Sequence, residues 1–257
     1  MQSPAETFDP RGFVPRVDEL ADRVIAITGA GDGIGRALAL ACARYGARVI
    51  LIGRTAAKLE TVYESIRAAG GPEPAIAPLD LERALAQDYD RIADAVDTRF
   101  GKLDGLVHNA ALLGTLTPIE HYDVPTWCRV MHVNVTAACA LTQVLLPALR
   151  ASADSSILFT SSAVGRRGRA YWGAYAVSKF AVEGLTQVLA AELEGVSRVR
   201  VNAINPGRAR TAMRRQAYPS ENLDSLPLAE SLVNPYVALL GPAGRAVTGR
   251  SFDCLDR

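Results

Sequence analysis

Residues 24–35 read VIAITGAGDGIG, and this stretch decides the fold. It begins with the apolar run 24–27, passes through a turn with four glycines in seven residues, and leads into the amphipathic stretch 34–45. A short apolar run without polar alternation is typical of a strand in a parallel sheet buried on both faces. The stretch therefore predicts a strand, a glycine-rich turn and a helix in succession.

The same alternation of short apolar runs and longer amphipathic stretches continues along the chain. Further predicted strands are 49–52, 75–77, 105–107, 157–159 and 199–201, with 247–252 as a possible last one. Further predicted helices are 56–69, 83–100, 125–149 and 173–193. This order predicts an α/β fold: a doubly wound, Rossmann-type three-layer sandwich around a parallel sheet of about seven strands. The carboxyl ends of such strands share one edge of the sheet, where ligands bind.

The domain organisation follows from the distribution of proline and of apolar residues. Residues 1–18 hold Pro4, Pro10 and Pro15 among polar residues, so we expect an irregular arm outside the core. No break in composition separates Leu20 from Phe252, so residues 19–257 are predicted to form a single domain.

The composition excludes several classes of protein. Apolar residues make up 49% and charged residues 21%, which excludes a largely disordered chain. A net charge of +1 provides no field for nucleic acid, and no apolar run reaches the roughly 18 residues of a membrane span. The four cysteines form no CxxC pair and the three histidines lack ligand spacing. We therefore expect no metal site, no disulfides and a cytoplasmic location.

The glycine-rich turn fits the pattern GxxxGxG rather than GxGxxG. Small residues let the backbone turn tightly and approach a pyrophosphate at the positive end of a helix. The turn residues expected to contact a dinucleotide are Gly29, Gly31, Asp32, Gly33, Ile34 and Gly35. The alternative is a glycine-rich turn without a ligand.

The residues after the second predicted strand bear on the choice of nucleotide. A carboxylate there would accept a bond from a ribose 2′-hydroxyl, but the sequence has Gly53, Arg54 and Thr55. Glycine leaves room for a 2′-phosphate and an arginine can bind it, so NADP(H) is favoured over NAD(H). Asp32 weighs against this prediction, and a solvated surface arginine is the alternative reading of Arg54.

Tyr175 and Lys179 are separated by four residues in the predicted helix 173–193. This spacing puts both side chains on one face, where the ammonium can stabilise a phenolate. Ser162 lies just beyond the strand 157–159, at the carboxyl edge of the predicted sheet, where ligands bind. Its hydroxyl can hold a carbonyl oxygen while the tyrosine donates a proton. The alternatives are an exposed helix pair and a plain Ser/Thr-rich loop.

Taken together, the motifs resemble those of the short-chain dehydrogenases/reductases over about residues 20–253. The matching residues are Thr28 to Gly35, Asn109-Ala110, Asn134, Ser162, Tyr175, Lys179, Asn205-Pro206-Gly207 and Thr211. Within that family the chain most resembles the YciK-like oxidoreductases, through RYGARVILIGR (44–54), VHNAA (107–111), VGRRGRAYWGAYAVSKFAVEG (164–184) and VRVNAINPGRARTAMR (199–214).

The resemblance implies the catalytic roles. Tyr175 would be the general acid, Lys179 the group that shifts its pKa and binds the nicotinamide ribose, and Ser162 the holder of the carbonyl. Asn134 would help to keep a water in a proton relay to Lys179. We therefore expect an NADP(H)-dependent oxidoreductase that interconverts a carbonyl and a secondary alcohol. The alternative is a non-catalytic NADP(H)-binding sensor or scaffold.

The resemblance also implies further contacts to the dinucleotide and an assembly. The additional cofactor-binding residues are Asp80, Leu81, Asn109, Ala110, Ala111, Pro206, Gly207 and Thr211. Ala111 departs from the glycine usual in the family, and a positive φ there would be strained. The family packs helices equivalent to 125–149 and 173–193 across symmetry axes, so a homodimer or homotetramer is expected.

Overall fold

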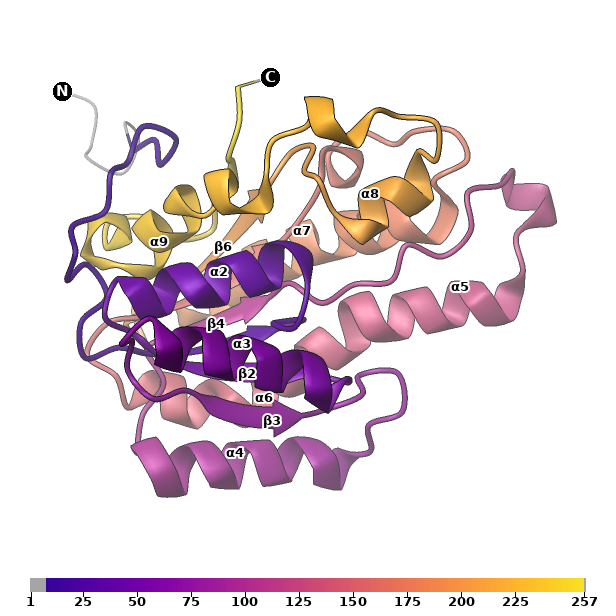
Figure 1. Cartoon of the computed structure of the whole chain (residues 1–257). Coiled ribbons are helices and arrows are strands. Elements are labelled where there is room, and N and C mark those ends of the chain that lie inside the picture. The colour runs from indigo at the N-terminus through magenta and orange to yellow at the C-terminus, as the bar shows by residue number, and fades with distance from the viewer. Residues whose placement is uncertain (1–7, 257) are drawn as a thin grey trace, which may run out of the picture.

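The computed structural model describes residues 8–256, which build a seven-stranded, wholly parallel sheet (Figure 1). The strand order is β3-β2-β1-β4-β5-β6-β7, which reverses direction at β1. The strands are β1 (Val24–Thr28), β2 (Arg48–Gly53), β3 (Ala75–Pro78), β4 (Gly105–His108), β5 (Ser155–Thr160), β6 (Val199–Asn205) and β7 (Ser251–Asp253). The predicted Rossmann-type α/β fold is confirmed.

Helices cover both faces of the sheet, and each face has its own core. The helices are α2 (Gly33–Arg44), α3 (Ala56–Ala68), α4 (Ala86–Phe100), α5 (Val124–Met131), α6 (Ala137–Arg150), α7 (Gly173–Leu193), α8 (Ala212–Ala217) and α9 (Asn234–Leu240). Ile25 and Ile27 of β1 pack with α2, α3 and α9, whereas Val24 and Ala26 pack with α4, α6 and α7. Alternate residues of a strand point to opposite faces, and this alternation produces the three layers.

Several element boundaries differ from the sequence-based prediction. The last strand is Ser251–Asp253, shorter and later than 247–252. The predicted helix 125–149 is interrupted by a π-helical segment, His132–Thr136, that separates α5 from α6. Helix α4 begins at Ala86 rather than at residue 83, because Asp88 accepts a hydrogen bond from the backbone of Leu85 and so caps the helix there.

The amino-terminal segment was predicted to lie outside the core, and this is wrong for the residues that the structure describes. Residues 8–18 form no helix or strand, as expected, but Phe8 and Phe13 pack against the core that contains α2. The ring of Phe8 meets that of Phe252 edge-on, with 5.8 Å between centroids. Residues 1–7 lie outside the described part of the chain.

One long helical stretch, Val124–Arg150, is apolar enough to cross a membrane by length and composition. Polar residues such as Asn134 and Gln143 interrupt this stretch, so it meets the criterion by mean hydropathy and not as an unbroken apolar run. In the fold, Leu141, Leu145 and Leu149 of α6 are fully buried against the sheet. The apolar character of this stretch thus supplies the core, as in the core helix of a globular protein.

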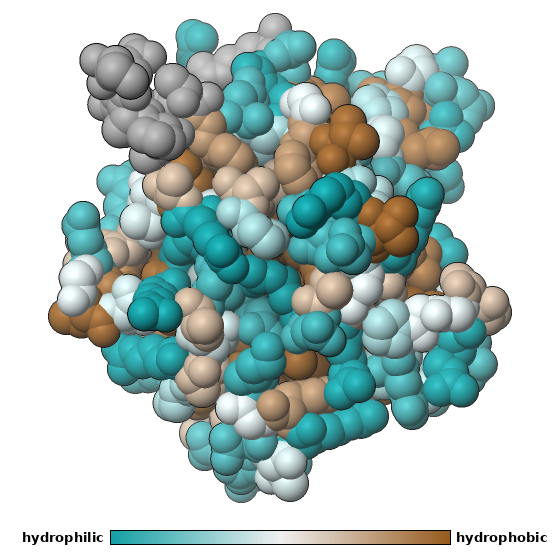
Figure 2. Space-filling model, turned by 90° about the vertical axis from the view of Figure 1, so that its left-hand side faces the viewer, coloured by the Kyte–Doolittle hydropathy of each residue, from teal (hydrophilic) through white to brown (hydrophobic). Residues whose placement is uncertain are grey.

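Charged groups close the amino edge of the sheet. Asp154, just before β5, accepts bonds from Arg23 at 2.5 Å, Arg245 at 2.9 Å and Arg200 at 3.2 Å. Figure 2 views this side of the molecule, and its surface is largely hydrophilic, with hydrophobic residues scattered over it. The chemistry of the fold is therefore concentrated at the opposite edge.

Candidate active site

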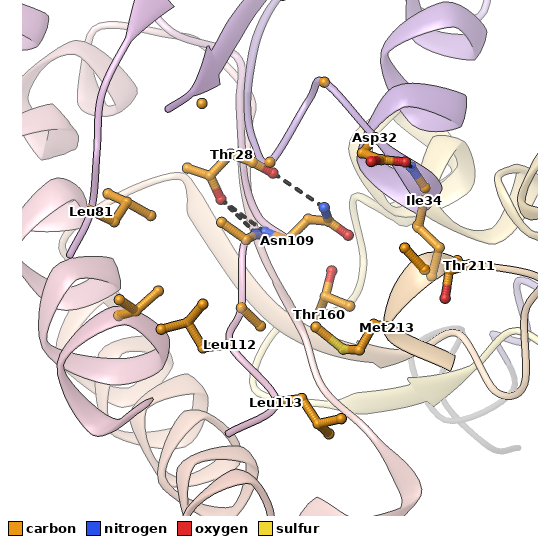
Figure 3. Close-up of a pocket in the computed structure, with 18 of the residues that line it drawn as sticks. Thr28, Asp32, Ile34, Leu81, Asn109, Leu112, Leu113, Thr160, Thr211 and Met213 are labelled. Carbon is orange, nitrogen blue, oxygen red and sulfur yellow. Dashed lines mark hydrogen bonds between the residues drawn. The ribbon is translucent and has the colours of Figure 1, made fainter. Parts of the chain in front are cut away.

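A cavity of about 540 Å³ opens at the carboxyl edge of the sheet. The segments that follow β1 to β6 line it, together with α7 and α8. Figure 3 shows some of these side chains, among them Thr28, Leu81, Asn109, Thr160 and Met213. Among the residues predicted for the site, only Gly35 and Asn134 do not line the cavity. The cavity therefore gathers residues that are up to 189 positions apart, from Thr28 to Ala217.

The glycine-rich turn is packed tightly between β1 and α2. A Cβ at Gly35 would lie 2.2 Å from the carbonyl oxygen of Gly29, so this buried position requires glycine. Gly29 has a φ of +68°, and a Cβ there would meet Asn109 and Ala110 at 3.1 Å. Gly35 thus permits the tight packing of the turn without lining the cavity itself. Gly33 and Ile34, in the first turn of α2, do line the cavity.

Asn109 fastens the end of β4 to this turn. Its side-chain amide donates to the carbonyl of Thr28 at 3.2 Å, and its backbone N–H donates to the Thr28 hydroxyl at 3.0 Å (Figure 3). The same hydroxyl accepts the N–H of Ala110 at 3.1 Å and donates to the carbonyl of Val107. Thr28, which the sequence placed only at the start of a motif, therefore joins two strand ends.

The mouth of the cavity near the second strand carries two cations. Arg54 is exposed there, and Lys58, one turn into α3, lines the same wall. Lys58 bonds Asp32 at 2.5 Å, which lowers the pKa of that carboxyl. Asp32 also caps α2 by accepting the N–H of Gly33 at 2.8 Å. The negative charge that weighed against a phosphate is therefore paired, and Lys58 is a cation that motif reading missed.

The next two strand ends supply the remaining wall near that mouth. Asp80 and Leu81 follow β3 and line the cavity, and Asp80 accepts the N–H of Glu82 at 3.1 Å in a tight turn. Ala111 also lines the cavity. Among residues 8–256, the only non-glycine residues with positive φ are Asp22 and Tyr171. The expected strain at Ala111 is thus absent, because its backbone does not need the left-handed region.

Three of the four predicted catalytic side chains, Ser162, Tyr175 and Lys179, meet on the floor of the cavity. Burial raises the pKa of Tyr175 to about 12, and the nearby Ser162 hydroxyl lowers it in part. The Lys179 ammonium lies 5.5 Å from the centroid of the Tyr175 ring and donates to the carbonyl of Thr160 at 2.7 Å. Burial lowers the pKa of Lys179 to about 8. The tyrosine is thus held protonated beside a desolvated cation.

Gly165 brings the turn after β5 against α7. A Cβ at Gly165 would lie 2.8 Å from Cβ of Lys179 and 2.9 Å from its carbonyl carbon and oxygen. Any side chain at this position would push the turn away from the helix. The distance between Ser162 and Tyr175 therefore depends on a glycine that makes no chemical contribution of its own.

A buried carboxylate, Glu183, extends the catalytic face of α7 by one more turn. Glu183 accepts a bond of 2.5 Å from Ser161, one of 3.0 Å from Ser251 and one of 3.3 Å from Arg166. Ser161 stands between Thr160, which receives the Lys179 bond, and Ser162. The charge of Glu183 also raises the pKa of Lys179 against the effect of burial. In the sequence, the four-residue spacing between Lys179 and Glu183 was the only signal that the carboxylate acts on the ammonium.

Asn134 lies in the π-helical segment and clamps the loop after β4. Its side chain accepts the N–H of Leu112 at 2.7 Å and donates to the Leu112 carbonyl and the Ser178 hydroxyl, both at 2.9 Å. The side chain is buried and does not line the cavity. Asn134 therefore acts on the site through Leu112 and through α7.

The segment after β6 forms the last wall. Pro206 and Gly207 line the cavity, and Gly207 has a φ of +77°. Thr211 caps α8 by accepting the N–H of Arg214 at 3.2 Å, and its methyl group would meet a Cβ placed on Gly33 at 3.3 Å. Thr211 and Ile34 lie close together at this point (Figure 3). The segment after β6 therefore lies directly against the glycine-rich turn at Gly33.

The residues present fit a dinucleotide. The first turn of α2 presents backbone N–H groups beside glycines, Arg54 and Lys58 stand at one mouth, and Tyr175 and Lys179 lie at the other end of the same cavity. A helix N-terminus attracts phosphate, and the switch point of a doubly wound sheet is where dinucleotides bind.

Comparisons with known proteins agree with this geometry. The family model described as short chain dehydrogenase matches residues 23–222. The oxidoreductase YciK of Escherichia coli K12 is 46% identical over 241 residues, which cover 94% of this chain and 95% of YciK.

Solved structures are equally similar. A short chain dehydrogenase from Pseudomonas syringae has a TM-score of 0.93 and 51% identity, over 95% of this chain and 98% of that one. One from Shigella flexneri 2a, complexed with NADP, has a TM-score of 0.91 and 46% identity, over 93% of this chain and 99% of that one. This chain belongs to the short chain dehydrogenase family and is an oxidoreductase of the YciK type.

Proposed function

We propose that the protein is an NADP(H)-dependent reductase that interconverts a carbonyl compound and a secondary alcohol. The observation that carries this proposal is that Ser162, Tyr175 and Lys179 together line one cavity that fits a dinucleotide, with the Lys179 ammonium 5.5 Å from the centroid of the Tyr175 ring. Binding a dinucleotide requires neither Ser162 nor the Tyr175 hydroxyl, whereas proton transfer to a carbonyl oxygen requires both.

In the direction of reduction, the side chains act as follows. The bound dinucleotide supplies the hydride for the carbonyl carbon. Ser162 donates a hydrogen bond to the carbonyl oxygen and fixes it beside Tyr175, which transfers its proton to that oxygen. A Tyr175 pKa of about 12 keeps the proton in place until negative charge develops on the substrate. The Lys179 ammonium then stabilises the phenolate, and oxidation reverses these steps.

We infer a preference for NADP(H) over NAD(H) from the cations at the far mouth. Arg54 and Lys58 stand where the second strand ends, and a 2′-phosphate binds arginine and lysine through charge-assisted bonds. The NADP in the Shigella flexneri relative supports this inference. Asp80, Leu81, Asn109 and Ala110 would then face the adenosine, and Pro206, Gly207 and Thr211 the nicotinamide.

We further propose that residues 19–257 act as one domain, in the cytoplasm, as a homodimer or homotetramer. Exposed apolar side chains on α7 (Val177, Phe180 and Val188) support the assembly, and four free thiols support the compartment. Light scattering at micromolar concentration should give a mass of at least twice 27.4 kDa. A monomer would contradict the assembly alone.

The test of the activity is NADPH oxidation over a panel of ketones, aldehydes and quinones. Tyr175→Phe should lower turnover by at least about 1,000-fold and leave NADPH affinity nearly unchanged, because only the proton donor is removed. Tyr63→Phe, which alters an α3 hydroxyl bonded to Glu73, is the matched control and should keep full activity. Full turnover in Tyr175→Phe would refute the mechanism. No turnover in the unmodified protein, with NADPH bound, would favour a sensor.

A further inference from the structure

The end of the cavity beside Tyr175 is apolar. Leu113, Trp172, Met213 and Ala217 pack in one cluster with the Tyr175 ring, and all four also line the cavity. Figure 3 shows Leu112, Leu113 and Met213 around the opening near Thr160. The ring centroids of Trp172 and Tyr175 are 5.7 Å apart. A substrate whose oxygen reaches Tyr175 therefore has its carbon skeleton against these side chains.

The charged groups that line the cavity lie mostly at the other end. Within the described chain, the carboxylates that line it are Asp32, Asp80 and Glu82, which follow β1 and β3. Apart from Lys179, the substrate end has one charged lining residue, Arg214. Arg214 bonds Glu221 through two nitrogens, both at 2.6 Å, and its guanidinium lies 3.8 Å above the Tyr218 ring. The charge of Arg214 is therefore neutralised by Glu221, and the Tyr218 ring covers one face of its guanidinium.

Three further arginines near this edge are engaged as well. Arg166 bonds Asp253 at 2.8 Å and Glu183 at 3.3 Å. Arg169 donates to the Tyr218 hydroxyl at 2.6 Å, and Arg210 pairs with Asp224 at 3.1 Å. Arg167, Arg208 and Arg215 are exposed nearby, but among the arginines at the substrate end that the structure describes only Arg214 lines the cavity. A substrate at that end therefore meets little unpaired positive charge.

We propose that the substrate is an uncharged carbonyl compound with an apolar body, seated against Leu113, Trp172 and Met213. This inference rests on the reductase activity proposed above and adds the class of substrate. Apolar surface that leaves water on binding contributes favourably in proportion to its area. A carboxylate on the same skeleton would lose its hydration next to apolar side chains, which opposes its binding unless a cation is free to pair with it.

Glu221 is then the residue that excludes anions. It holds Arg214 in a bidentate intramolecular ion pair. A substrate carboxylate would have to compete with Glu221 for the Arg214 guanidinium. Removing the Glu221 charge would leave Arg214 available at the apolar wall. Glu221→Gln should therefore widen the substrate range toward acids without improving the reduction of neutral compounds.

The experiment compares matched pairs: methyl 4-oxocyclohexanecarboxylate with its free acid, and methyl 4-acetylbenzoate with its free acid. Initial rates of NADPH oxidation give kcat/KM for each. The unmodified protein should prefer each ester by at least tenfold, and Glu221→Gln should reduce that ratio at least threefold through a gain on the acid. Glu64→Gln, at an exposed position of α3, is the matched control and should leave the ratio unchanged.

A second variant covers the case in which Glu221→Gln loosens the segment around α8. Met213→Lys places a cation directly on the apolar wall and should also shift the ratio toward the acids. Equal or greater kcat/KM for the acids in the unmodified protein would overturn the inference alone, as would an unchanged ratio in both variants. Absence of turnover across the whole panel with NADPH bound would overturn the reductase activity, and the inference with it.

Discussion

The two edges of the sheet use charge in opposite ways. At the amino edge, Asp154 is surrounded by Arg23, Arg200 and Arg245, and Arg200 also donates to the carbonyls of Leu239 and Gly244. At the carboxyl edge, the Lys179 ammonium is equally buried but bonds one carbonyl, that of Thr160. The first set of charges is satisfied within the fold, whereas the second keeps bonding capacity for a ligand.

This difference separates stability from activity. Burial lowers the pKa of Lys179 to about 8, so at neutral pH the fold carries a desolvated cation that it only partly compensates. Burial alone would raise the pKa of Asp154, but the bond from Arg245 and the charges of Arg200 and Arg23 reverse this and lower it. Changes at the two edges should therefore have opposite consequences.

The largest effect is expected for Lys179→Met. Turnover should fall at least 100-fold and NADPH should bind more weakly, because the phenolate loses its cation and the ribose loses a ligand. The free energy of unfolding should nevertheless rise by about 1 to 2 kcal/mol at pH 7, since a buried charge is replaced by an apolar group of similar length. Thermal unfolding without ligand measures this.

The pH dependence of the same variant provides its control. Between pH 8 and the ordinary lysine value of 10.5, the folded protein binds fewer protons at this site than the unfolded chain, so its stability rises with pH. Lys179→Met should lack that rise. A variant less stable than the unmodified protein at pH 7 would mean that the ammonium is fully compensated, and the comparison between the edges would fail.

The second effect is expected at the amino edge, with Asp154→Asn. Removing this carboxylate leaves Arg200 buried without its partner, which should cost about 3 kcal/mol of stability. The folded pKa of Asp154 is lowered, so its contribution is present at neutral pH and is lost as the pH falls through that value. Urea unfolding at pH 7 and at a pH well below 3.8 measures both.

Turnover of Asp154→Asn, assayed well below its unfolding temperature, should match that of the unmodified protein. The control Asp224→Asn removes the partner of Arg210 in an exposed pair and should change stability by less than about 0.5 kcal/mol. An equally small change in Asp154→Asn would show that the amino edge carries no special share of the stability.

A smaller effect is expected from Arg54→Ala. The thermal shift caused by NADPH should exceed that caused by NADH in the unmodified protein, and the ratio of their affinities should fall about tenfold in the variant. Arg67→Ala, which removes an exposed arginine paired with Glu73 at the far end of α3, should leave the ratio unchanged. Equal thermal shifts from both nucleotides would show that Arg54 does not contribute to the choice between NADPH and NADH.

The smallest effect is expected from Glu183→Gln. Two groups on α7 itself act on Lys179, the Tyr175 ring and the Glu183 carboxylate. The carbonyl of Thr160 in β5 accepts the Lys179 hydrogen bond. Arg166, in the turn after β5, bonds Glu183. Without the Glu183 charge, the pKa of Lys179 should fall further. The basic limb of the pH profile for reduction should therefore move to lower pH, by less than one unit. Glu192→Gln, exposed on α7, should not move it.

The sequence predicted what depends on local spacing. The β1–turn–α2 unit, the position of Ser162 at a strand end and the common face of Tyr175 and Lys179 follow from periodicity within one or two elements. It could not predict contacts made across the fold. Lys58 reaches Asp32 from 26 residues away, and Ser251 reaches Glu183 from 68 residues away. The docking of Phe8 and the π-helical break at Asn134 likewise depend on surfaces that exist only after folding.

Gly165 has a consequence for engineering this enzyme. Because the turn after β5 touches α7 at backbone level, the wall that carries Ser162, Tyr175 and Lys179 behaves as a fixed template. The opposite wall, built from the loop after β4 and from α8, is held by side chains that can be exchanged, such as Leu113 and Met213. Libraries aimed at new substrates should therefore randomise the second wall and leave residue 165 untouched, since even alanine there would misalign the chemistry before it altered selectivity.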